Sequence, residues 1–367
     1  MFGSILISVV TLMHIYLFWR TAGVPFIQRH VPRKLLIATG VVLWSGFSLG
    51  RVYGHHGTGI LATAIEFFGM NWMAVSFLLC VSLFAVDLAT GFGLFFRRQV
   101  GSLRGWALVA GGLLSVIALV QGLRPPVVQQ YDVRLSGLPA EMDGTTLVAM
   151  SDLHIGSLFG QRWVAARVAQ VEARQPDLVV LLGDIFEGHG PPEKEIIAIL
   201  GRLRAPLGVW AVPGNHESHG DRNESLDLLQ KAGIRVLENR WAQVRPGLVL
   251  AGVEDLTTLR RAQRSGNLMG PALSGRPPGA AVLLSHTPWQ AREAADAGAG
   301  LMLSGHTHGG QIWPFSYLIR LRYPMLAGRY QIGPMTAIVC RGTGTWGPRM
   351  RLWRPGEILS ITLGVKE

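Results

Sequence analysis

Residues 146–154 read Thr-Leu-Val-Ala-Met-Ser-Asp-Leu-His, a short apolar run that ends in polar side chains. Such a run is typical of a strand buried in a sheet. Similar runs occur at 178–182, 209–212, 248–253, 281–284 and 301–303. Helix-like stretches lie between several of them, at 162–174, 193–203, 224–231 and 289–295. The alternation predicts an α/β domain in which helices cover a sheet.

Side chains that bind metals follow five of these runs. They are, in chain order, Asp152 and His154, Asp184, Asn215 and His216, His286, and His306 and His308. The carboxyl ends of the strands in an α/β sheet share one edge, where ligand crevices form. A single histidine after a strand is most often a core or surface residue. Because the pattern repeats in five loops of one domain, we expect these side chains to form one site.

The residue types indicate which ligand this site takes. Imidazole and carboxylate groups suit Mn, Fe, Zn or Ni, and no cysteine accompanies them to suggest a closed structural zinc site. Seven or eight ligands are too many for one ion, but they suit two ions about 3.5–4 Å apart that share a bridging carboxylate. We therefore expect two divalent ions, with manganese favoured, and a bridging hydroxide as the nucleophile.

The N-terminal third has a different composition from the rest. The chain has 367 residues, 49% of them apolar, and a net charge of +11. Residues 1–124 hold nine basic and two acidic side chains, whereas the remaining 243 hold 25 basic and 21 acidic ones. Most of the excess charge therefore lies between apolar blocks, as in membrane proteins, and we expect no nucleic-acid partner.

Four apolar blocks predict a bundle of about four transmembrane helices, at 2–19, 35–50, 72–96 and 103–123. An interfacial segment carrying Glu66 is expected before the third. A cleaved signal peptide is the alternative for the first block, but no basic residue precedes it. Asp87, inside the third block, is either functional or paired with a polar partner.

Charge also predicts the topology and the domain boundaries. Lys and Arg are concentrated in the first and third loops, which are therefore expected to be cytoplasmic. The protein is then expected to be an integral protein of a bacterial plasma membrane, with everything after Arg124 outside the cytoplasm. We expect an anchor at 1–124, a linker at 125–130 that begins Pro125-Pro126, and a catalytic domain at 131–367.

The strand-end motifs resemble those of a known family. Asp152-x-His154, Gly183-Asp184, Gly214-Asn215-His216-Glu217, Ser285-His286 and Gly305-His306-Thr307-His308 are similar, in order, to the five signature blocks of the calcineurin-like metallophosphoesterases. The resemblance covers residues 131–363 and implies an α/β/β/α sandwich. The sequence around these blocks is similar to the membrane-associated bacterial phosphodiesterase branch, some of whose members hydrolyse the pyrophosphate of a UDP-linked lipid A precursor.

The resemblance also implies a role for each site residue. Asp152, His154 and His308 would bind one metal, Asn215, His286 and His306 the other, and Asp184 would bridge them. His216 would face the scissile phosphate as the catalytic residue and protonate the leaving oxygen. Glu217 is one candidate for orienting His216. Many relatives carry an Asp shortly after the bridging Asp, a place that Glu187 either fills or leaves empty.

The function expected from these features is that of a membrane-anchored hydrolase. It would cleave a lipid-linked or envelope phosphodiester or pyrophosphate, with a phosphorylated small-molecule or lipid substrate and the bilayer as partners. A phosphomonoesterase or nucleotide phosphodiesterase, and a non-hydrolytic metal-dependent sensor or scaffold, are the alternatives. The oligomeric state and the physiological substrate are not determined by the sequence.

Two basic segments are candidates for contact with the substrate. Arg260, Arg261 and Arg264 form the first, although such arginines are more often simply solvated. Residues 313–330 form the second, which is rich in aromatic residues and includes Trp313, Arg320 and Arg322. This mixture suits a lipid headgroup layer, and a loop that covers the core is the alternative.

Overall fold

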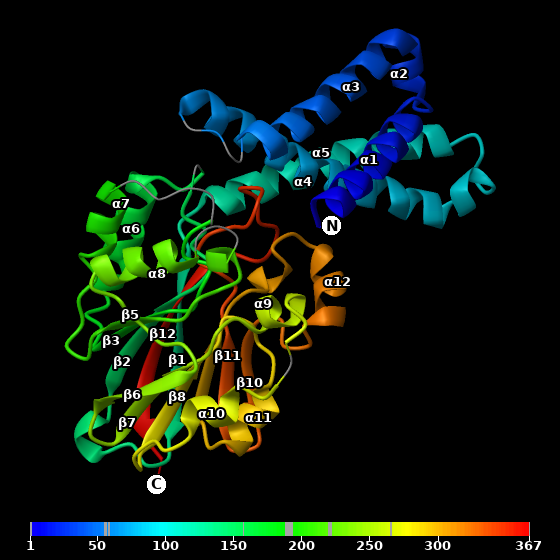
Figure 1. Ribbon diagram of the computed structural model, residues 1–367. Coiled ribbons are helices and arrows are strands. Elements are labelled where there is room, and N and C mark those ends of the chain that lie inside the picture. The colour runs from blue at the N-terminus through cyan, green and yellow to red at the C-terminus, as the bar shows by residue number, and fades with distance from the viewer. Residues whose placement is uncertain are drawn as a thin grey trace. The chain divides into compact units, whose positions relative to one another are not determined.

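The computed structural model describes residues 2–54, 57, 59–156, 158–187, 194–218, 222–264 and 266–366 (Figure 1). The chain divides into two compact units. The first comprises Met1–Arg124 with Gly347–Trp353, and the second Pro125–Trp346 with Arg354–Glu367.

The first unit is helical. Its α-helices are α1 (Phe2–Thr21), α2 (Pro25–His30), α3 (Arg33–Leu49), α4 (Ile60–Ala89) and α5 (Val100–Leu123), with a π-helical turn at Gly50–Gly54 and a 3-10 turn at Gly91–Gly93. Within the described part of the chain, four segments are long and apolar enough to cross a membrane: Gly3–Thr21, Arg33–Gly54, Ile60–Ala89 and Val100–Leu123. The predicted set of four apolar helices is thus confirmed.

The third of these helices differs from the prediction. Instead of an interfacial segment followed by a span at 72–96, α4 runs unbroken from Ile60 and ends at Ala89, and Glu66 is buried within it. Asn71 does not interrupt the helix because its Nδ2 donates to the Phe67 carbonyl 2.7 Å away. Gly69 packs against the backbone of α3 so closely that a Cβ would not fit, as small residues do in membrane helix pairs.

Asp87, near the end of α4, is fully buried and paired with basic groups. One oxygen accepts hydrogen bonds from Arg104 Nε (2.9 Å) and Nη2 (2.7 Å). The other lies 2.6 Å from Arg20 Nε and accepts the Tyr16 hydroxyl at 2.7 Å. This carboxylate therefore joins α1, α4 and α5.

Replacing Asp87 by asparagine is expected to destabilise the helical unit by about 3–5 kcal/mol, because two buried guanidinium groups lose their counter-charge. Thermal unfolding of the full chain in detergent measures the loss. Ser82→Ala on the same helix is the matched control, since the Ser82 hydroxyl donates to the Leu78 carbonyl of its own helix at 2.9 Å. Equal melting temperatures for the two variants would contradict the assigned role.

Part of the first unit comes from far along the chain. Within Gly347–Trp353, the Arg351 N–H donates to the Ala118 carbonyl (2.9 Å), and the Trp353 N–H donates to Gln121 Oε1 (2.8 Å). Both acceptors belong to the last turns of α5. A late segment of the sequence thus adds to a helix near the N-terminus.

The second unit is built on two six-stranded sheets. The first has the order β1 (Val127–Leu135), β12 (Glu357–Val365), β2 (Thr145–Met150), β3 (Leu178–Leu181), β4 (Val209–Ala211) and β5 (Arg235–Val236). The second has the order β10 (Gly328–Ile332), β11 (Met335–Val339), β9 (Leu301–Ser304), β8 (Ala280–Leu284), β7 (Leu248–Gly252) and β6 (Arg240–Arg245). β1 begins inside the 125–130 stretch that we expected to be a linker.

Helices cover the outer faces of both sheets. They are α6 (Gln161–Glu172), α7 (Lys194–Leu200), α8 (Arg222–Lys231), α9 (Leu256–Arg261), α10 (Met269–Leu273) and α11 (Ala291–Asp296). A further helix, α12 (Phe315–Arg322), follows the loop after β9. Figure 1 shows α6, α7 and α8 on one side of the strands and α10 and α11 on the other. One apolar core lies between the sheets and one under each helical layer. This is the predicted α/β/β/α sandwich.

The strand directions bring the site together. β2, β3, β4 and β5 are parallel neighbours in the first sheet. β7, β8, β9 and β11 are parallel neighbours in the second. Because the loops after parallel strands leave the same edge, each sheet presents its strand-end residues together.

Candidate metal centre

The loops of the first sheet supply five candidate side chains. Asp152 and His154 follow β2, Asp184 follows β3, and Asn215 and His216 follow β4; all are buried. The loops after β2 and β3 remain paired, because the His154 N–H donates to the Asp184 carbonyl at 3.0 Å. The His216 N–H donates to Asp184 Oδ1 at 2.8 Å. Asp184 is therefore held by both neighbouring loops.

The second sheet supplies His286 after β8 and His306 and His308 after β9. His286 Nδ1 lies 2.8 Å from the Leu182 carbonyl, which can only accept, so Nδ1 carries the hydrogen. His286 Nε2 then faces Asp184 Oδ2 at 3.2 Å. A histidine held in this way has one ring nitrogen aimed at the site, as metal-binding histidines do.

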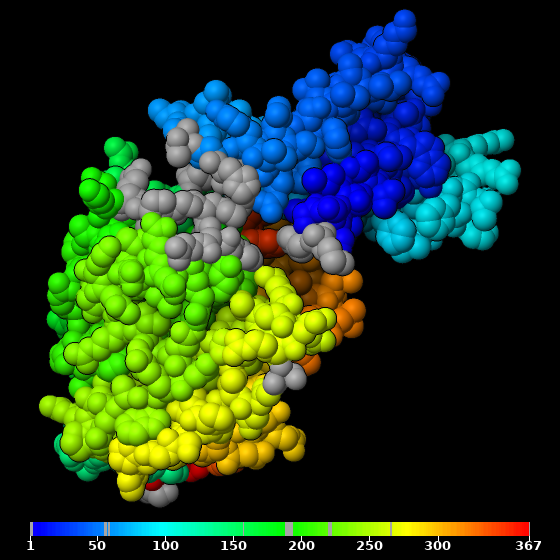
Figure 2. Space-filling view, in the orientation of Figure 1, coloured from blue at the N-terminus to red at the C-terminus, as the bar shows by residue number. Residues whose placement is uncertain are grey.

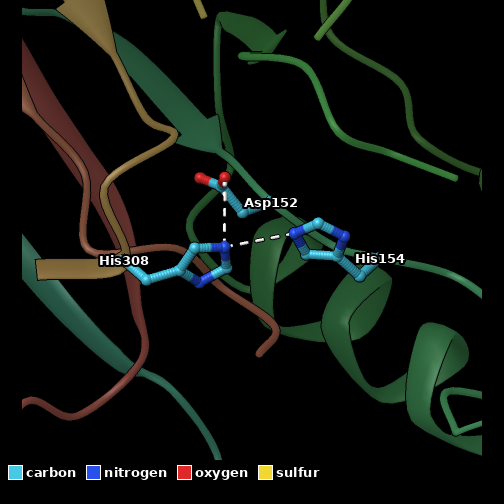
Figure 3. Close-up of side chains that lie close together, drawn as sticks. All are labelled: Asp152, His154 and His308. Carbon is cyan, nitrogen blue, oxygen red and sulfur yellow. Dashed lines mark hydrogen bonds and ion pairs between the residues drawn. The ribbon is translucent and has the colours of Figure 1, made fainter. Parts of the chain in front are cut away.

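Three groups of these side chains are compact enough to hold a metal ion. They are Asp152, His154 and His308; His154, Asp184 and His216; and Asp184, His286 and His306, with the ligand atoms of each group within 4.8 Å of one another. Figure 3 shows the first, in which His308 Nε2 lies 3.4 Å from Asp152 Oδ1 and 3.1 Å from His154 Nε2. Asp184 and His154 each belong to two groups, so the groups form one continuous cluster.

The donor set fits a divalent metal. Among the residues that the structure describes, buried Asn215 Oδ1 has no hydrogen-bond partner. Such an oxygen is costly to bury unless it binds something else. It belongs to the residue between Gly214 and His216, whose N–H reaches Asp184. Together with imidazole and carboxylate groups, an amide oxygen suits Mn, Fe or Zn.

The backbone at the site is held in an uncommon conformation. Asp152, His154, Asp184, His306 and His308 all have positive φ, between 47° and 70°. Residues other than glycine rarely adopt this left-handed region, and they do so mainly where surrounding structure enforces it at functional sites. The tight packing of the loops enforces it here, since a Cβ on Gly214 would overlap the Asp184 carboxylate.

Burial and neighbouring charges move the pKa values of the cluster. Burial alone lowers the pKa of His154, but the carboxylates of Glu187, Asp184 and Asp152 together outweigh it and raise this pKa to about 9. Burial likewise opposes the charged form of Asp184, yet His286 and the other nearby histidines hold its pKa well below the ordinary range. Burial also opposes the charged form of His286, yet Asp184 and the other nearby carboxylates hold its pKa well above the ordinary range. Burial and the nearby His286 charge lower the pKa of His306 to about 4. His154 and His286 must therefore release protons to bind a metal.

Glu187 is the carboxylate that orients the histidines. Its Oε2 lies 2.7 Å from His154 Nδ1. Its Oε1 lies 3.6 Å from His216 Nδ1, and its backbone carbonyl accepts a hydrogen bond from the same nitrogen at 3.2 Å. That Glu187 fills the place of the Asp expected after the bridging Asp stays a prediction. The alternative that Glu217 orients His216 is wrong, because both Glu217 oxygens accept backbone N–H groups, from Asp184, Ile185, Phe186 and Gly214.

The Glu187→Gln variant is expected to bind Mn²⁺ about 10- to 100-fold more weakly, the usual effect of removing a partner of a metal-binding histidine. The amide still accepts from His154 Nδ1 but no longer supports its basicity. Titration of the full chain with Mn²⁺ gives the affinity. Glu172→Gln is the control, because Glu172 is exposed and its carboxylate forms a solvent-exposed ion pair with Arg202 at 3.5 Å. Unchanged affinity in Glu187→Gln would refute the role given to this carboxylate.

Two further residues, Asp255 and Tyr323, lie near the site but were not predicted as site residues. Buried Asp255 follows β7 and accepts from Thr287 Oγ1 (2.6 Å) and the Thr258 N–H (2.7 Å), which fixes the loop after His286. The Tyr323 hydroxyl lies 2.8 Å from His306 Nε2. Asp255 does end an apolar run, so its place at a strand end was the available signal. Tyr323 had none.

Only some of the predicted substrate-binding residues lie close to one another. Arg260 and Arg322 both lie over the Trp289 ring, 5.7 and 4.7 Å from its centroid, and Trp289 stacks on Tyr323 at 5.3 Å. Arg264 instead lies 3.8 Å from Glu254. Arg261 and Arg320 are exposed, and Trp313 is half-buried at the turn before α12. One arginine from each predicted segment thus lies over Trp289, the ring that stacks on Tyr323.

Comparison with known proteins agrees with this geometry. The family model described as calcineurin-like phosphoesterase matches residues 145–310. An uncharacterised metallophosphoesterase of Campylobacter jejuni is 31% identical over 263 residues, which are 71% of this chain and 69% of that protein. One of Aquifex aeolicus is 34% identical over 64% of this chain and 91% of its own length. A transmembrane protein with metallophosphoesterase domain of Danio rerio is 33% identical over 70% of this chain, but this match spans only 62% of that protein.

Solved structures are less similar. A 5'-nucleotidase precursor of Thermus thermophilus has a TM-score of 0.32 and 16% identity, covering 59% of this chain and 54% of its own. A dimetal phosphatase of Danio rerio has a TM-score of 0.29 and 11% identity, covering 55% and 88%. The assignment rests instead on the sequence relatives and on the cluster of histidine and aspartate side chains. The chain is a member of the calcineurin-like metallophosphoesterase family, with apolar helices that could span a membrane.

Proposed function

We propose that this protein is a membrane-anchored phosphodiesterase that uses two divalent ions, with manganese favoured. The observation that carries the proposal is the position of Asp184. It shares one possible metal group with His154 and His216 and another with His286 and His306. A carboxylate common to two adjoining groups is what a bridged metal pair requires.

In this proposal each ion has its own ligands from the chain. Asp152, His154 and His308 hold one ion, and Asn215, His286 and His306 hold the other. Asp184 contributes to both. When bound, such a metal pair supplies Lewis-acid stabilisation of phosphate oxygens and a nucleophile at neutral pH. The fixed tautomer of His286 and the hydrogen bond from His154 to Glu187 hold these side chains in place.

His216 is the proposed catalytic acid. Its Nδ1 donates to the Glu187 carbonyl, so Nε2 is the nitrogen turned toward Asp184 Oδ2, 4.0 Å away. From there, protonated Nε2 can stabilise charge that develops on phosphate and donate its proton to the leaving oxygen. Because Nδ1 is occupied, the ring is held in one orientation during this transfer.

The proposed substrate is a lipid-linked or envelope phosphodiester or pyrophosphate. Arg260 and Arg322, placed together on Trp289, support a substrate with negative charge beyond the scissile phosphate. The four apolar helices support a substrate that resides in or near a bilayer. Trp313, Arg320, Arg261 and Arg264 remain candidates for contacts farther from the scissile bond.

The proposed location is the plasma membrane of a bacterium, with the catalytic unit outside the cytoplasm. Basic residues support this topology because Arg29, Arg33 and Lys34 follow the first span, and Arg97 and Arg98 precede the fourth. Reporter fusions at the C-terminus test it. A reporter that is active only in the cytoplasm would reverse the assignment.

Turnover by the purified full chain tests the activity. With Mn²⁺, the chain is expected to hydrolyse an aryl phosphodiester, and His216→Ala is expected to lower kcat about 10²- to 10³-fold while Mn²⁺ content is unchanged. His30→Ala is the control, since His30 is exposed on α2. Faster turnover of a phosphomonoester or nucleotide would favour those alternatives. No turnover despite bound metal would favour a sensor or scaffold.

A further inference from the structure

Helix α12 exposes apolar side chains. Tyr317, Leu318 and Leu321 are 62%, 59% and 84% exposed. Their spacing places them beside one another on the helix surface. Ser316 is buried on the opposite side. Figure 2 shows the orange segment that contains α12 at the molecular surface. A helix that faces water normally exposes polar groups, so a continuous apolar patch marks an interaction surface.

The charge around this patch indicates what it binds. Residues 297–346 contain four arginines and no acidic residue. Arg320 lies within α12 and is exposed, and Phe315 adds a further exposed ring at the start of the helix. Arginines beside aromatic and aliphatic groups suit an anionic bilayer surface, where rings enter the headgroup layer and guanidinium groups meet phosphates. The chain's own apolar helices keep a bilayer within reach.

Both ends of α12 are attached to the loop that carries His306 and His308. At the start, Ser316 packs so closely on Gly310 that a Cβ there would not fit. Just after the end, the Tyr323 hydroxyl bonds to His306 Nε2 at 2.8 Å, and its ring stacks on Trp289. The position of α12 and the geometry of this loop are therefore linked.

We propose that α12 lies in the headgroup layer of the membrane, with Tyr317, Leu318 and Leu321 inserted and Arg320 at the lipid phosphates. This contact holds the His306–His308 loop at the depth of lipid phosphate groups. Docking requires only the exposed face of α12. Its consequence for catalysis, a preference for phosphoesters of membrane lipids over soluble ones, rests on the proposed function.

Spin labels on the full chain test the docking without an activity assay. In a Cys80→Ala, Cys340→Ala background, nitroxide labels are placed at Leu318→Cys or Leu321→Cys. The chain is reconstituted singly in nanodiscs of phosphatidylcholine and phosphatidylglycerol. Both labels are expected to be open to oxygen but protected from a water-soluble nickel complex, about 5–10 Å below the phosphates. A label at Gln230→Cys, exposed on α8, is expected to be fully open to nickel.

Measurements with the same labels can also contradict the proposal. Nickel accessibility at both positions equal to that at Gln230 would overturn the proposal. Single copies exclude protection by a second chain. Adding Arg320→Glu is expected to raise nickel accessibility severalfold in anionic discs, and no change would refute the role of charge. Hydrolysis of a soluble aryl phosphodiester by the labelled chain reports the proposed function separately, so the two failures are distinguishable.

Discussion

The Asp184→Asn variant is expected to retain less than about one thousandth of the kcat/KM of the unmodified chain, because two metal positions lose a shared charged ligand. Asp184 Oδ2 lies 3.2 Å from His286 Nε2 and 3.9 Å from His154 Nε2. Asparagine keeps the shape and can still accept the His216 N–H, but it cannot neutralise two cations. The loss therefore arises from charge and bridging rather than from misfolding.

Metal content and kinetics together check this expectation. Bound Mn²⁺ per chain is expected to fall from two ions to one or none in Asp184→Asn. Asp177→Asn is the matched control, because Asp177 precedes the same strand at its other end and accepts the Thr146 N–H at 2.8 Å, a bond that asparagine can keep. Two bound ions and near-normal turnover in Asp184→Asn would exclude the bridging role.

The strand-end residues were predictable because their signal is local. Each apolar run and the polar group after it are adjacent in sequence, and parallel strands bring their ends together without further information. His154 and His286 come from loops of different sheets, yet both reach Asp184. The roles of the individual ligands stay predictions, since three possible groups share residues.

The errors concern features that depend on distant or directional contacts. Glu217 stands next to His216 in sequence but turns to backbone groups, whereas Glu187, from another loop, reaches the imidazoles. The third span was expected to begin at residue 72, after an interfacial segment. The chain is already helical before that point, because Gly69 packs on α3 and Asn71 forms a hydrogen bond within α4.

Contacts between segments that are far apart in the sequence could not be predicted either. β1 and β12 are parallel neighbours although more than two hundred residues separate them. Segment Gly347–Trp353 belongs to the unit of α5 although it follows the catalytic loops. Neither segment contains a motif that indicates which segment it contacts. Positive φ at five site residues is likewise not apparent from the sequence: Asp and His adopt it more readily than most residues, but the packed loops enforce it here.

The Glu217→Ala variant is expected to lose about 4 kcal/mol or more of unfolding free energy. Its fully buried carboxylate accepts the N–H groups of Ile185 (2.7 Å), Gly214 (2.7 Å), Asp184 (3.0 Å) and Phe186 (3.0 Å). Removing the acceptor leaves these buried donors without a hydrogen bond. Each donor that finds no other partner costs about 1–3 kcal/mol of stability. The substitution also leaves the His216 N–H bond to Asp184 Oδ1 to hold the loop after β4 against the loop after β3.

Thermal unfolding of the full chain in detergent measures this loss, with an expected decrease of about 10 °C for the catalytic unit. Metal content and turnover are expected to fall with it, because Asp184 and Asn215 lie on the two loops that Glu217 joins. Glu293→Ala, at an exposed position of α11, is the control and is expected to change the unfolding free energy by less than about 0.5 kcal/mol. If Glu217→Ala melted like the control, the carboxylate would not be what joins the loops. If it lost stability but kept both ions, the metal cluster would be held by the strands alone.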